Sequence, residues 1–368
     1  MIRPANIDDL CAVIAEARDS GTKLRLRGGG TKDAIGAPCD AQIIDTCGFA
    51  GVVNYDPPEL VLTVGAGTPL AEIETLVASE GQMLAFDPFD HGAMLGNDGG
   101  ATIGGVVAAG VAGPARLSRG GARDHLLGFT AVSGRGETFV AGAKVVKNVT
   151  GYDLPKLMAG SWGRLAALTE LTLKVLPAPR TRLTLAMRGL DATGAVAAMA
   201  RAMGSAAEVT AAAHLPDWQG KAVTALRLDG FAESVAARAA MLTGFEALEG
   251  GDALWMAVRD AAPLPRELPL WRLIVAPGQA PDVIAALPGA EWLFDWAGGL
   301  IWLASNADPA VIRTAAEAAD GHATLMRASE AMRRAVPALH PQPTALAAIE
   351  ERVRRAFDPD GVFETGRF

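Results

Sequence analysis

A run of three glycines, Gly28, Gly29 and Gly30, follows a strand-like stretch near the start of the chain. The preceding Leu-Arg-Leu-Arg alternates apolar and basic side chains, as a half-buried strand does. Glycine lets a backbone approach a ligand closely and reach the positive φ angles that aim several N–H groups at one anion. Two neighbours, Thr31 and Lys32, could add a hydroxyl donor and a positive charge. The stretch is a candidate phosphate cradle, although a tight loop without a ligand fits the local pattern equally well.

These glycines match neither of the common nucleotide-binding motifs. A Walker loop requires GxxxxGK[ST], and Lys32 stands at the wrong spacing for it. The dinucleotide-binding fingerprint GxGxxG requires a third glycine where Asp33 stands. The Gly-Ala-Gly at residues 65–67 fails in the same way, because Leu70 stands at the third position. The sequence therefore does not support a standard Rossmann nucleotide-binding turn.

Two further segments in this half of the chain are rich in glycine and small polar residues. Residues 100–110 contain a short helix of small residues with Thr102, Gly104 and Gly105 at its start, and the bare N-terminus of such a helix is a potential anion site. Residues 147–169 carry a polar cluster before a short helix and a glycine before a strand: Asn148, Gly151, Tyr152, Asp153 and Gly163. Three backbone-exposing segments in one domain predict a long ligand that is held at several points.

Composition excludes several classes of function. The net charge is −8, and phosphate backbones require a basic face, so nucleic acid is not an expected partner. The 3 cysteines form no CxxC pair, so we expect neither an iron–sulfur cluster nor a disulfide framework in this chain, which suits a reducing cytoplasm. The polar N-terminus is not a signal peptide, and no apolar stretch is long enough to cross a bilayer. We therefore expect a cytoplasmic protein without a transmembrane segment.

The order of helix and strand patterns predicts an α+β protein with two domains and a tail. The 368 residues suffice for two domains of ordinary size. Helix and strand patterns mix irregularly up to residue 178. From 179 to 330 the order β-α-β-β-α occurs roughly twice, which predicts a sheet covered by helices on one side. A last helix and a tail occupy 331–368.

The three glycine-bearing segments together resemble the FAD-binding domain of the p-cresol methylhydroxylase and vanillyl-alcohol oxidase superfamily. In that family a strand and a glycine-rich loop hold the pyrophosphate, and Arg27–Lys32 matches them. A T-x-G-G segment lies against the flavin, matched by Thr102–Gly105, and a G-S-x-G-x-L-x-x-x-T strand closes the domain, matched by Gly160–Thr169. The resemblance implies a two-part FAD-binding domain over 1–178, a smaller α+β cap domain with ferredoxin-like β-α-β-β-α-β units over 179–330, and a C-terminal helix and tail over 331–368 that return to the FAD domain.

The resemblance also implies a set of residues that contact FAD. They lie in the three glycine-bearing segments, in the loops that pass the flavin, and at a basic position near the C-terminus. The set is Arg27, Gly28, Gly29, Gly30, Thr31, Lys32, Pro88, Thr102, Gly104, Gly105, Ser118, Asp124, Asn148, Gly151, Tyr152, Asp153, Gly163 and Arg367. No residue is assigned a catalytic role, and no metal ligand is expected.

Three longer stretches, residues 108–137, 144–180 and 358–368, are similar to the smaller flavoprotein-like subunits of bacterial glycolate oxidases. This similarity implies an FAD-dependent oxidoreductase subunit that works with a larger flavin subunit and an iron–sulfur subunit. It also implies a small hydroxy-acid substrate, with glycolate oxidised to glyoxylate and the electrons passed through flavin to iron–sulfur clusters. The partners could hold the protein at the inner membrane surface.

Two features keep other functions open. The larger flavin subunit of the family carries closely spaced histidines, whereas the 5 histidines of this chain are scattered and form no HxH or HxxxH pair: His91, His125, His214, His322 and His340. The C-terminal Glu-Thr-Gly-Arg-Phe replaces the family's Asn-Pro-Gly-Lys/Arg, although Arg367 keeps the basic position. The alternatives are a non-catalytic assembly subunit with a flavin-type fold and a stand-alone FAD-dependent oxidase for a small alcohol or hydroxy acid.

Overall fold

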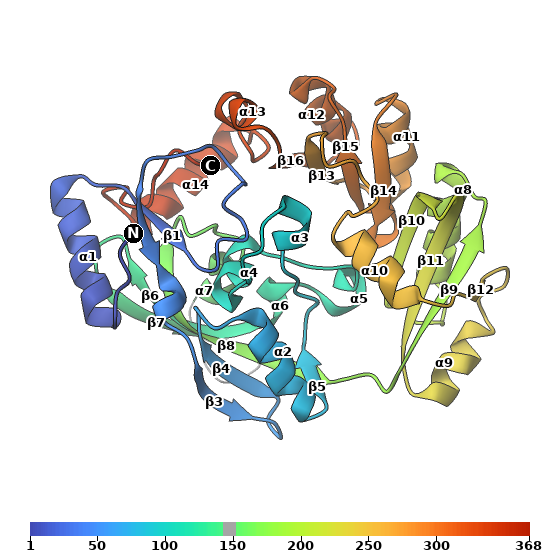
Figure 1. Ribbon diagram of the computed structural model, residues 1–368, viewed down its shortest axis with the longest axis horizontal. Helices are drawn as coiled ribbons and strands as arrows, with labels where there is room; N and C mark the ends of the chain where they lie inside the picture. The colour runs from blue at the N-terminus through green and yellow to red at the C-terminus, as the bar shows by residue number, and fades with distance from the viewer. Residues whose placement is uncertain (143–151) are drawn as a thin grey trace.

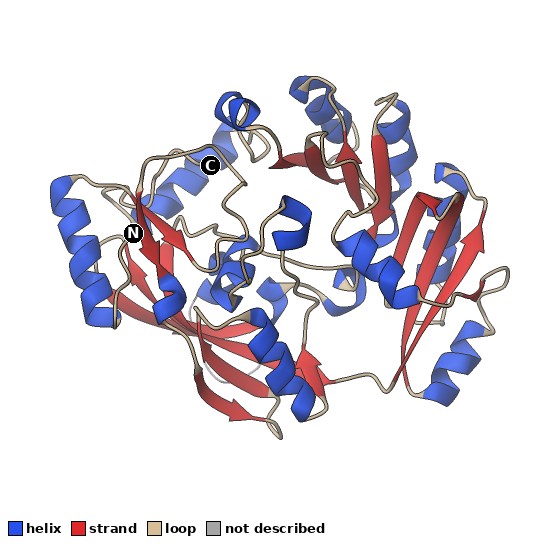
Figure 2. Cartoon of the chain, viewed as in Figure 1, coloured by secondary structure: helices blue, strands red, loops and turns tan. Residues whose placement is uncertain are grey.

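The computed structural model describes residues 1–142 and 152–368, which form two main β-sheets with helices packed on them (Figures 1 and 2). The first sheet ends with a strand that stops at Pro177, and the second sheet begins at Thr181. The last helix runs back toward the N-terminal side, where both chain ends lie (Figure 1). Within the described residues, no helix combines the length and the hydrophobicity needed to cross a membrane.

Helix α1 (Ile7–Ser20) and a two-stranded parallel sheet form the N-terminal part. The Asn6 side chain caps the first turn of the helix, and Gly21 ends it in the left-handed conformation with φ 71°. The two strands are β1 (Leu24–Arg27) and β2 (Gln42–Asp45). Leu10 packs here in one hydrophobic cluster with Phe363 from the far end of the chain. The C-terminal tail therefore completes the core around β1.

An antiparallel sheet in the order β3-β4-β8-β6-β7 forms the centre of the first half, with β5 paired to β8. Its strands are β3 (Val52–Asp56), β4 (Val61–Gly65), β5 (Gln82–Leu84), β6 (Leu126–Ser133), β7 (Thr138–Gly142) and β8 (Ala166–Pro177). One longer helix and five short ones lie in the connections: α2 (Leu70–Ser79), α3 (Gly92–Leu95), α4 (Ile103–Ala109), α5 (Arg116–Arg119), α6 (Ala122–His125) and α7 (Leu154–Met158).

The second half is a continuous eight-stranded sheet in the order β12-β9-β11-β10-β14-β15-β13-β16. The first four strands in the chain are β9 (Thr181–Arg188), β10 (Ala211–Trp218), β11 (Lys221–Gly230) and β12 (Glu246–Ala247). The last four are β13 (Leu270–Ile274), β14 (Glu291–Asp295), β15 (Leu300–Ala304) and β16 (His322–Arg327). Each set of four has the spatial order 4-1-3-2, and the sets meet where β10 pairs with β14.

The predicted repeat is therefore confirmed as two ferredoxin-like β-α-β-β-α-β units that share one sheet. Their helices are α8 (Ala192–Met203), α9 (Ala232–Ala239), α11 (Ala280–Ala285) and α12 (Pro309–Glu317). Helix α10 (Gly251–Arg259) links the two units, and α13 (Glu330–Ala335) and α14 (Thr344–Phe357) follow the second.

Polar contacts join the second sheet to the loop around α5. Arg119 pairs with Asp229 of β11, with 2.6 Å between Nη2 and Oδ2, and both side chains are largely buried. The Trp296 indole, which follows β14, donates from Nε1 to the Gly113 carbonyl at 3.0 Å. Ser118 donates its hydroxyl to the Thr210 carbonyl at 2.8 Å. These contacts fix how the second sheet faces the glycine-rich segments.

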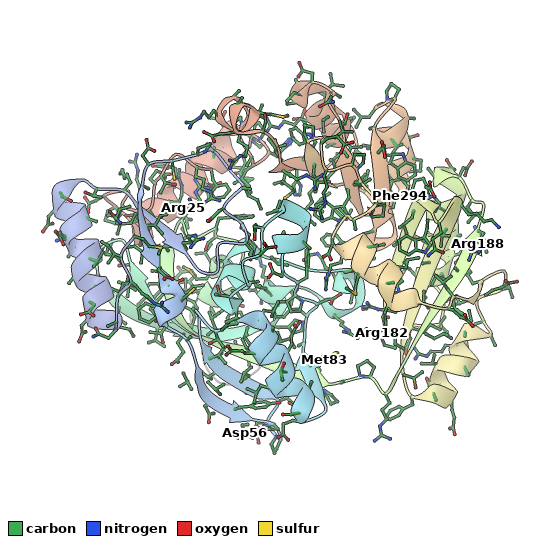
Figure 3. All side chains as sticks on the ribbon, in the orientation of Figure 1. Arg25, Asp56, Met83, Arg182, Arg188 and Phe294 are labelled. Carbon is green, nitrogen blue, oxygen red and sulfur yellow. The ribbon has the colours of Figure 1, made fainter. Side chains whose placement is uncertain are left out.

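We expect the replacement Phe294→Ala to lower the free energy of unfolding by about 3–5 kcal/mol, because it leaves a cavity under β14. Phe294 is fully buried in the second hydrophobic core (Figure 3). The matched control is Phe231→Ala, because Phe231 is 65% exposed. It should change the unfolding free energy by no more than about 1 kcal/mol. Urea unfolding followed by circular dichroism measures both, and equal shifts would contradict the core assignment.

Candidate functional site

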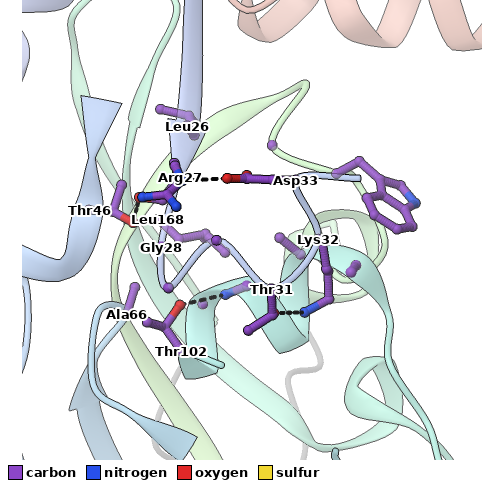
Figure 4. Close-up of a pocket in the computed structure, with 18 of the residues that line it drawn as sticks. Leu26, Arg27, Gly28, Thr31, Lys32, Asp33, Thr46, Ala66, Thr102 and Leu168 are labelled. Carbon is purple, nitrogen blue, oxygen red and sulfur yellow. Dashed lines mark hydrogen bonds and ion pairs between the residues drawn. The ribbon is translucent and has the colours of Figure 1, made fainter. Parts of the chain in front are cut away.

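A cavity opens around the glycine run, at the point where β1 ends (Figure 4). We call it the inner cavity. The loop after β1, the start of α4, the segment after α7 and the C-terminal tail meet there, although they are far apart in the sequence. The predicted site residues on its wall are Arg27, Gly28, Gly29, Gly30, Thr31, Lys32, Thr102, Gly104, Gly105, Gly163 and Arg367. Members of all three glycine-bearing segments therefore line one space.

The backbone N–H groups of residues 28–32 are candidate donors to an anion at the inner cavity. Among the hydrogen bonds of the described residues, none is donated by these N–H groups. Gly30 has φ 79°, and the Asp33 N–H donates a hydrogen bond to the Gly30 carbonyl at 3.0 Å. The loop therefore forms a tight turn at this point. Successive unpaired N–H groups in a curved loop form a concave donor surface for an anion.

Close packing between two loops explains why two of these positions are glycines. A Cβ atom on Gly29 would lie 1.6 Å from the Gly100 carbonyl oxygen, and one on Gly28 would lie 2.2 Å from Thr102 Oγ1. The loop after β1 and the segment before α4 thus touch backbone to backbone, with no room for a side chain. The contact between the two loops therefore explains the glycines at positions 28 and 29 as well as the approach of a ligand would.

The start of α4 does not offer free N–H groups, which corrects the expectation for this segment. Ile103 N–H donates to the Thr68 carbonyl at 3.0 Å, and Gly104 N–H donates to the Ala66 carbonyl at 2.8 Å. Gly105 N–H donates to the hydroxyl of Thr102 at 3.3 Å, which caps the helix. The idea of an anion site at this helix start is wrong, because its donors are already satisfied. The segment contributes a smooth wall to the cavity instead.

Lys32 supplies a partly buried positive charge to the inner cavity. Its Nζ lies 3.4 Å from Thr31 Oγ1, and no carboxylate of the described residues forms an ion pair with it. Burial lowers the pKa of Lys32 to about 8, while the nearby Asp90 acts in the opposite direction. The amine is thus charged at neutral pH and would gain from an anion placed beside it.

The two predicted arginines of the inner cavity bind the loop itself. Arg27 Nε lies 2.7 Å from Asp33 Oδ2, so an acid of this chain already neutralises part of its charge. Arg367 donates from Nε to the Ile35 carbonyl at 2.6 Å and from Nη2 to the Lys32 carbonyl. Burial, followed by the charge of Arg25, lowers the pKa of Arg367 to about 10. The C-terminal tail therefore holds the loop after β1 in place through the hydrogen bonds of Arg367.

Ser118, Asp124 and Pro88 line neither cavity described in this subsection. Ser118 belongs to the contact between the two sheets. Asp124 accepts the Gly121 N–H at 2.8 Å and caps α6. Pro88 is buried in the loop that leads to α3. The contacts or burial of each of these residues explain its presence without a ligand.

The polar cluster expected before α7 is only partly described. Tyr152 is 92% exposed, and Asp153 caps α7 and pairs with Lys156, with 2.7 Å between Oδ2 and Nζ. Neither side chain reaches a cavity wall. Asn148 and Gly151 lie outside the described residues. Gly163, with φ 71°, faces Leu26 on the wall of the inner cavity.

A second cavity of about 430 Å³ adjoins the first, and Ala109 and Trp162 line both. We call it the outer cavity. It lies between the first-half loops and the second sheet, and its polar lining consists of His91, Arg272, His322, Thr324, His340 and Gln342. Three of the histidines that appear scattered in the sequence therefore meet in one place. The spacing of these histidines in the sequence does not predict that they lie together, because they come from a loop, the start of β16 and the segment before α14.

The histidines of the outer cavity do not form a metal centre. His340 Nδ1 accepts the Ala323 N–H at 3.2 Å, so its Nε2 carries the proton and donates to Glu317 Oε1 at 3.1 Å. His91 Nδ1 is buried without a partner, and burial together with the charge of Lys32 holds the pKa of His91 well below its usual range. In the described part of the chain, no three histidine, cysteine or acidic side chains lie close enough to share a metal ion.

Sequence comparisons relate the chain to flavoproteins. The family described as FAD binding domain matches residues 1–142. Glycolate oxidase subunit GlcE of Escherichia coli is 36% identical over 96% of this chain and 95% of its own length. D-lactate dehydrogenase of Archaeoglobus fulgidus is 30% identical over 51% of this chain, and glycolate oxidase subunit GlcD of Bacillus subtilis is 29% identical over 50%. These two matches cover 41% and 38% of those longer proteins.

A solved structure of alkyldihydroxyacetonephosphate synthase shares the fold, with a TM-score of 0.67, 14% identity, and coverage of 98% of this chain and 76% of that one. The identity to GlcE over nearly the whole of both chains is what shows the family. The resemblance drawn from the glycine-bearing segments is thereby confirmed. The chain belongs to the glycolate oxidase subunit GlcE family, which consists of FAD-binding oxidoreductase subunits with the p-cresol methylhydroxylase type of fold.

Proposed function

We propose that this chain is the redox subunit of a glycolate oxidase assembly and holds FAD in the inner cavity, with the diphosphate on the N–H groups of residues 28–32. The observation that carries the proposal is this run of N–H groups without partners among the described residues, beside the Lys32 amine, which contacts only the Thr31 hydroxyl and forms no ion pair among those residues. Oriented N–H groups and a cation are the donors that a diphosphate requires.

The shape of the two cavities supports an extended ligand. The inner cavity measures about 130 Å³, which is smaller than the sites that enclose whole cofactors. It adjoins the outer cavity at the wall formed by Ala109 and Trp162, which line both. We infer that the inner cavity would take the diphosphate, which is the central part of FAD, and that the flavin side of the cofactor would extend toward the shared wall.

FAD, when bound, would supply the acceptor for the hydride, which carries two electrons from the alcohol carbon of a hydroxy acid, while the hydroxyl proton would leave separately. The residues of this chain would bind and orient FAD and would shield it from water. The loop of residues 28–32 would hold the diphosphate, the uncharged wall of α4 would exclude water, and Arg367 would keep the loop in place through its bonds to the Ile35 and Lys32 carbonyls.

The remaining steps of the proposed function require partners. The chain has 3 cysteines, too few for the four thiolates of a typical cluster, so electrons would leave through an iron–sulfur protein. We propose glycolate as the substrate and glyoxylate as the product, because the relative that is similar over its full length is a glycolate oxidase subunit. A location in the cytoplasm or at the inner membrane surface stays a prediction from the sequence.

One observation favours the alternative of a non-catalytic assembly subunit, namely the small volume of the inner cavity. Copurification of the assembly distinguishes the two. Under our proposal, the isolated full chain carries close to one FAD, seen in its absorption spectrum, and the assembly contains iron that this chain alone lacks. A colourless chain that neither retains nor binds added FAD would refute our proposal and favour the assembly subunit.

We expect the replacement Gly29→Ala to weaken FAD binding at least about tenfold, because the new methyl group would collide with the Gly100 carbonyl and displace the N–H groups of the loop. Equilibrium titration with FAD measures this. Gly100→Ala is the matched control, since a Cβ there meets nothing within 4 Å. Similar affinities of the two variants would show that the loop does not hold the cofactor.

We expect the FAD affinity of the unmodified protein to fall between pH 7 and pH 9. Lys32 has a pKa of about 8 without ligand, and a bound diphosphate would raise it, so binding favours the charged form and is lost as pH rises. Lys32→Met should weaken binding about 10- to 100-fold at pH 7 and flatten this pH dependence. Lys32→Arg should retain affinity at pH 9. A steep decline that persists in Lys32→Met would rule out Lys32 as its source.

A further inference from the structure

The outer cavity contains a positive charge that the chain does not neutralise. Arg272 lies in the middle of β13, where it pairs with Trp302 of β15 and Thr324 of β16. Its guanidinium forms no ion pair and no hydrogen bond with any other described residue, and it lines the cavity. Burial, with a smaller contribution from the charge of Arg116, lowers the pKa of Arg272 to about 10, so the group is charged at neutral pH.

The lining of the outer cavity provides no acid to balance Arg272. Among the described residues on its wall there is no aspartate or glutamate, and the titratable ones besides Arg272 are His91, His322 and His340. Burial, and then the charge of Arg272, lowers the pKa of His322. The nearby acid Asp295 lies outside the lining, and its carboxylate accepts the Trp296 N–H at 2.7 Å. The electrostatic environment thus favours an anion from outside the chain.

A constrained turn holds Arg272 in position. The guanidinium carbon lies 5.2 Å from the centre of the Trp296 ring, and the Arg116 guanidinium lies 5.0 Å from the same ring. The indole is itself fixed by its bond to the Gly113 carbonyl. Trp296 and Ala297 both have left-handed backbones, with φ 50° and 56°. Consecutive non-glycine residues keep this costly conformation only where the surroundings enforce it, and such strain concentrates at binding sites.

From this geometry we propose that Arg272 anchors the carboxylate of a small monocarboxylic acid in the outer cavity, and that it sets the preference of the chain for an anionic substrate over a neutral alcohol. The inference rests on the proposed function for the identity of the acid, a short 2-hydroxy acid. A guanidinium can donate two parallel hydrogen bonds to a carboxylate, and among the described residues it is the only group on this wall with a permanent charge. Trp296 acts as its positioning residue.

Calorimetric titration of the FAD-loaded full chain with glycolate, and separately with neutral glycolamide, tests the anchor. We expect glycolate to bind at least about tenfold more tightly than glycolamide. Equal affinities, or no detectable glycolate binding, would overturn the inference without any variant. This comparison needs no altered protein, so it stands even where a variant does not fold.

The replacement Arg272→Gln should weaken glycolate binding at least about tenfold and leave glycolamide binding unchanged. Arg272→Lys should give an intermediate loss, because an ammonium keeps the charge but not the paired donors. Arg201→Gln is the matched control, as Arg201 lies exposed at the end of α8. Unchanged glycolate affinity in Arg272→Gln would overturn the inference.

The FAD content of each protein separates this inference from the proposed function. Arg272 does not line the inner cavity, so Arg272→Gln should retain FAD at the level of the unmodified chain. A variant that keeps FAD and loses glycolate supports the anchor. An unmodified chain that binds glycolate but no FAD refutes the proposed function and leaves Arg272 as a carboxylate site.

Discussion

The contact between the loop after β1 and the segment before α4 is the constraint on which the inner cavity depends. Gly29 approaches the Gly100 carbonyl so closely that a Cβ would lie 1.6 Å from it. This packing shapes the loop of residues 28–32 so that their N–H groups find no partner among the described residues. The C-terminal tail holds the same loop through the hydrogen bonds that Arg367 donates to the Lys32 and Ile35 carbonyls. Three distant parts of the chain thus create one donor surface.

A second constraint is the way the eight-stranded sheet is docked on the first half. The Arg119–Asp229 ion pair and the bond from Trp296 to the Gly113 carbonyl bring β13 and β16 to the wall beside α4. The outer cavity exists only because of this docking. The two cavities share a wall at Ala109 and Trp162. Lys32 on the inner cavity and Arg272 on the outer cavity are partly buried cations that form no ion pair among the described residues. The charges of the molecule therefore point to two anionic groups, a diphosphate and a carboxylate.

Some of the expectations from sequence failed for reasons that are visible in the packing. The pattern at Thr102–Gly105 suggested free N–H groups at a helix start, but neighbouring carbonyls at Ala66 and Thr68 take up two of them. Glycine at such a position indicates close approach, and sequence alone cannot tell whether a ligand or another backbone makes it. The FAD contact of Tyr152 stays a prediction, and its side chain is almost fully exposed in the structure. The histidines look scattered in the sequence, and three of them share the outer cavity.

The sequence by itself determined the local elements, the two ferredoxin-like units and the location of the glycine loop after β1, because hydrophobic period and glycine runs act over a few residues. It also determined the family, since 36% identity over nearly the whole chain reflects many positions at once. The tertiary structure alone decided which N–H groups stay unpaired, which cations lack an acid, and that Arg272, His91 and His322 line one cavity. These properties depend on neighbours that are far apart in the chain, so no local pattern encodes them.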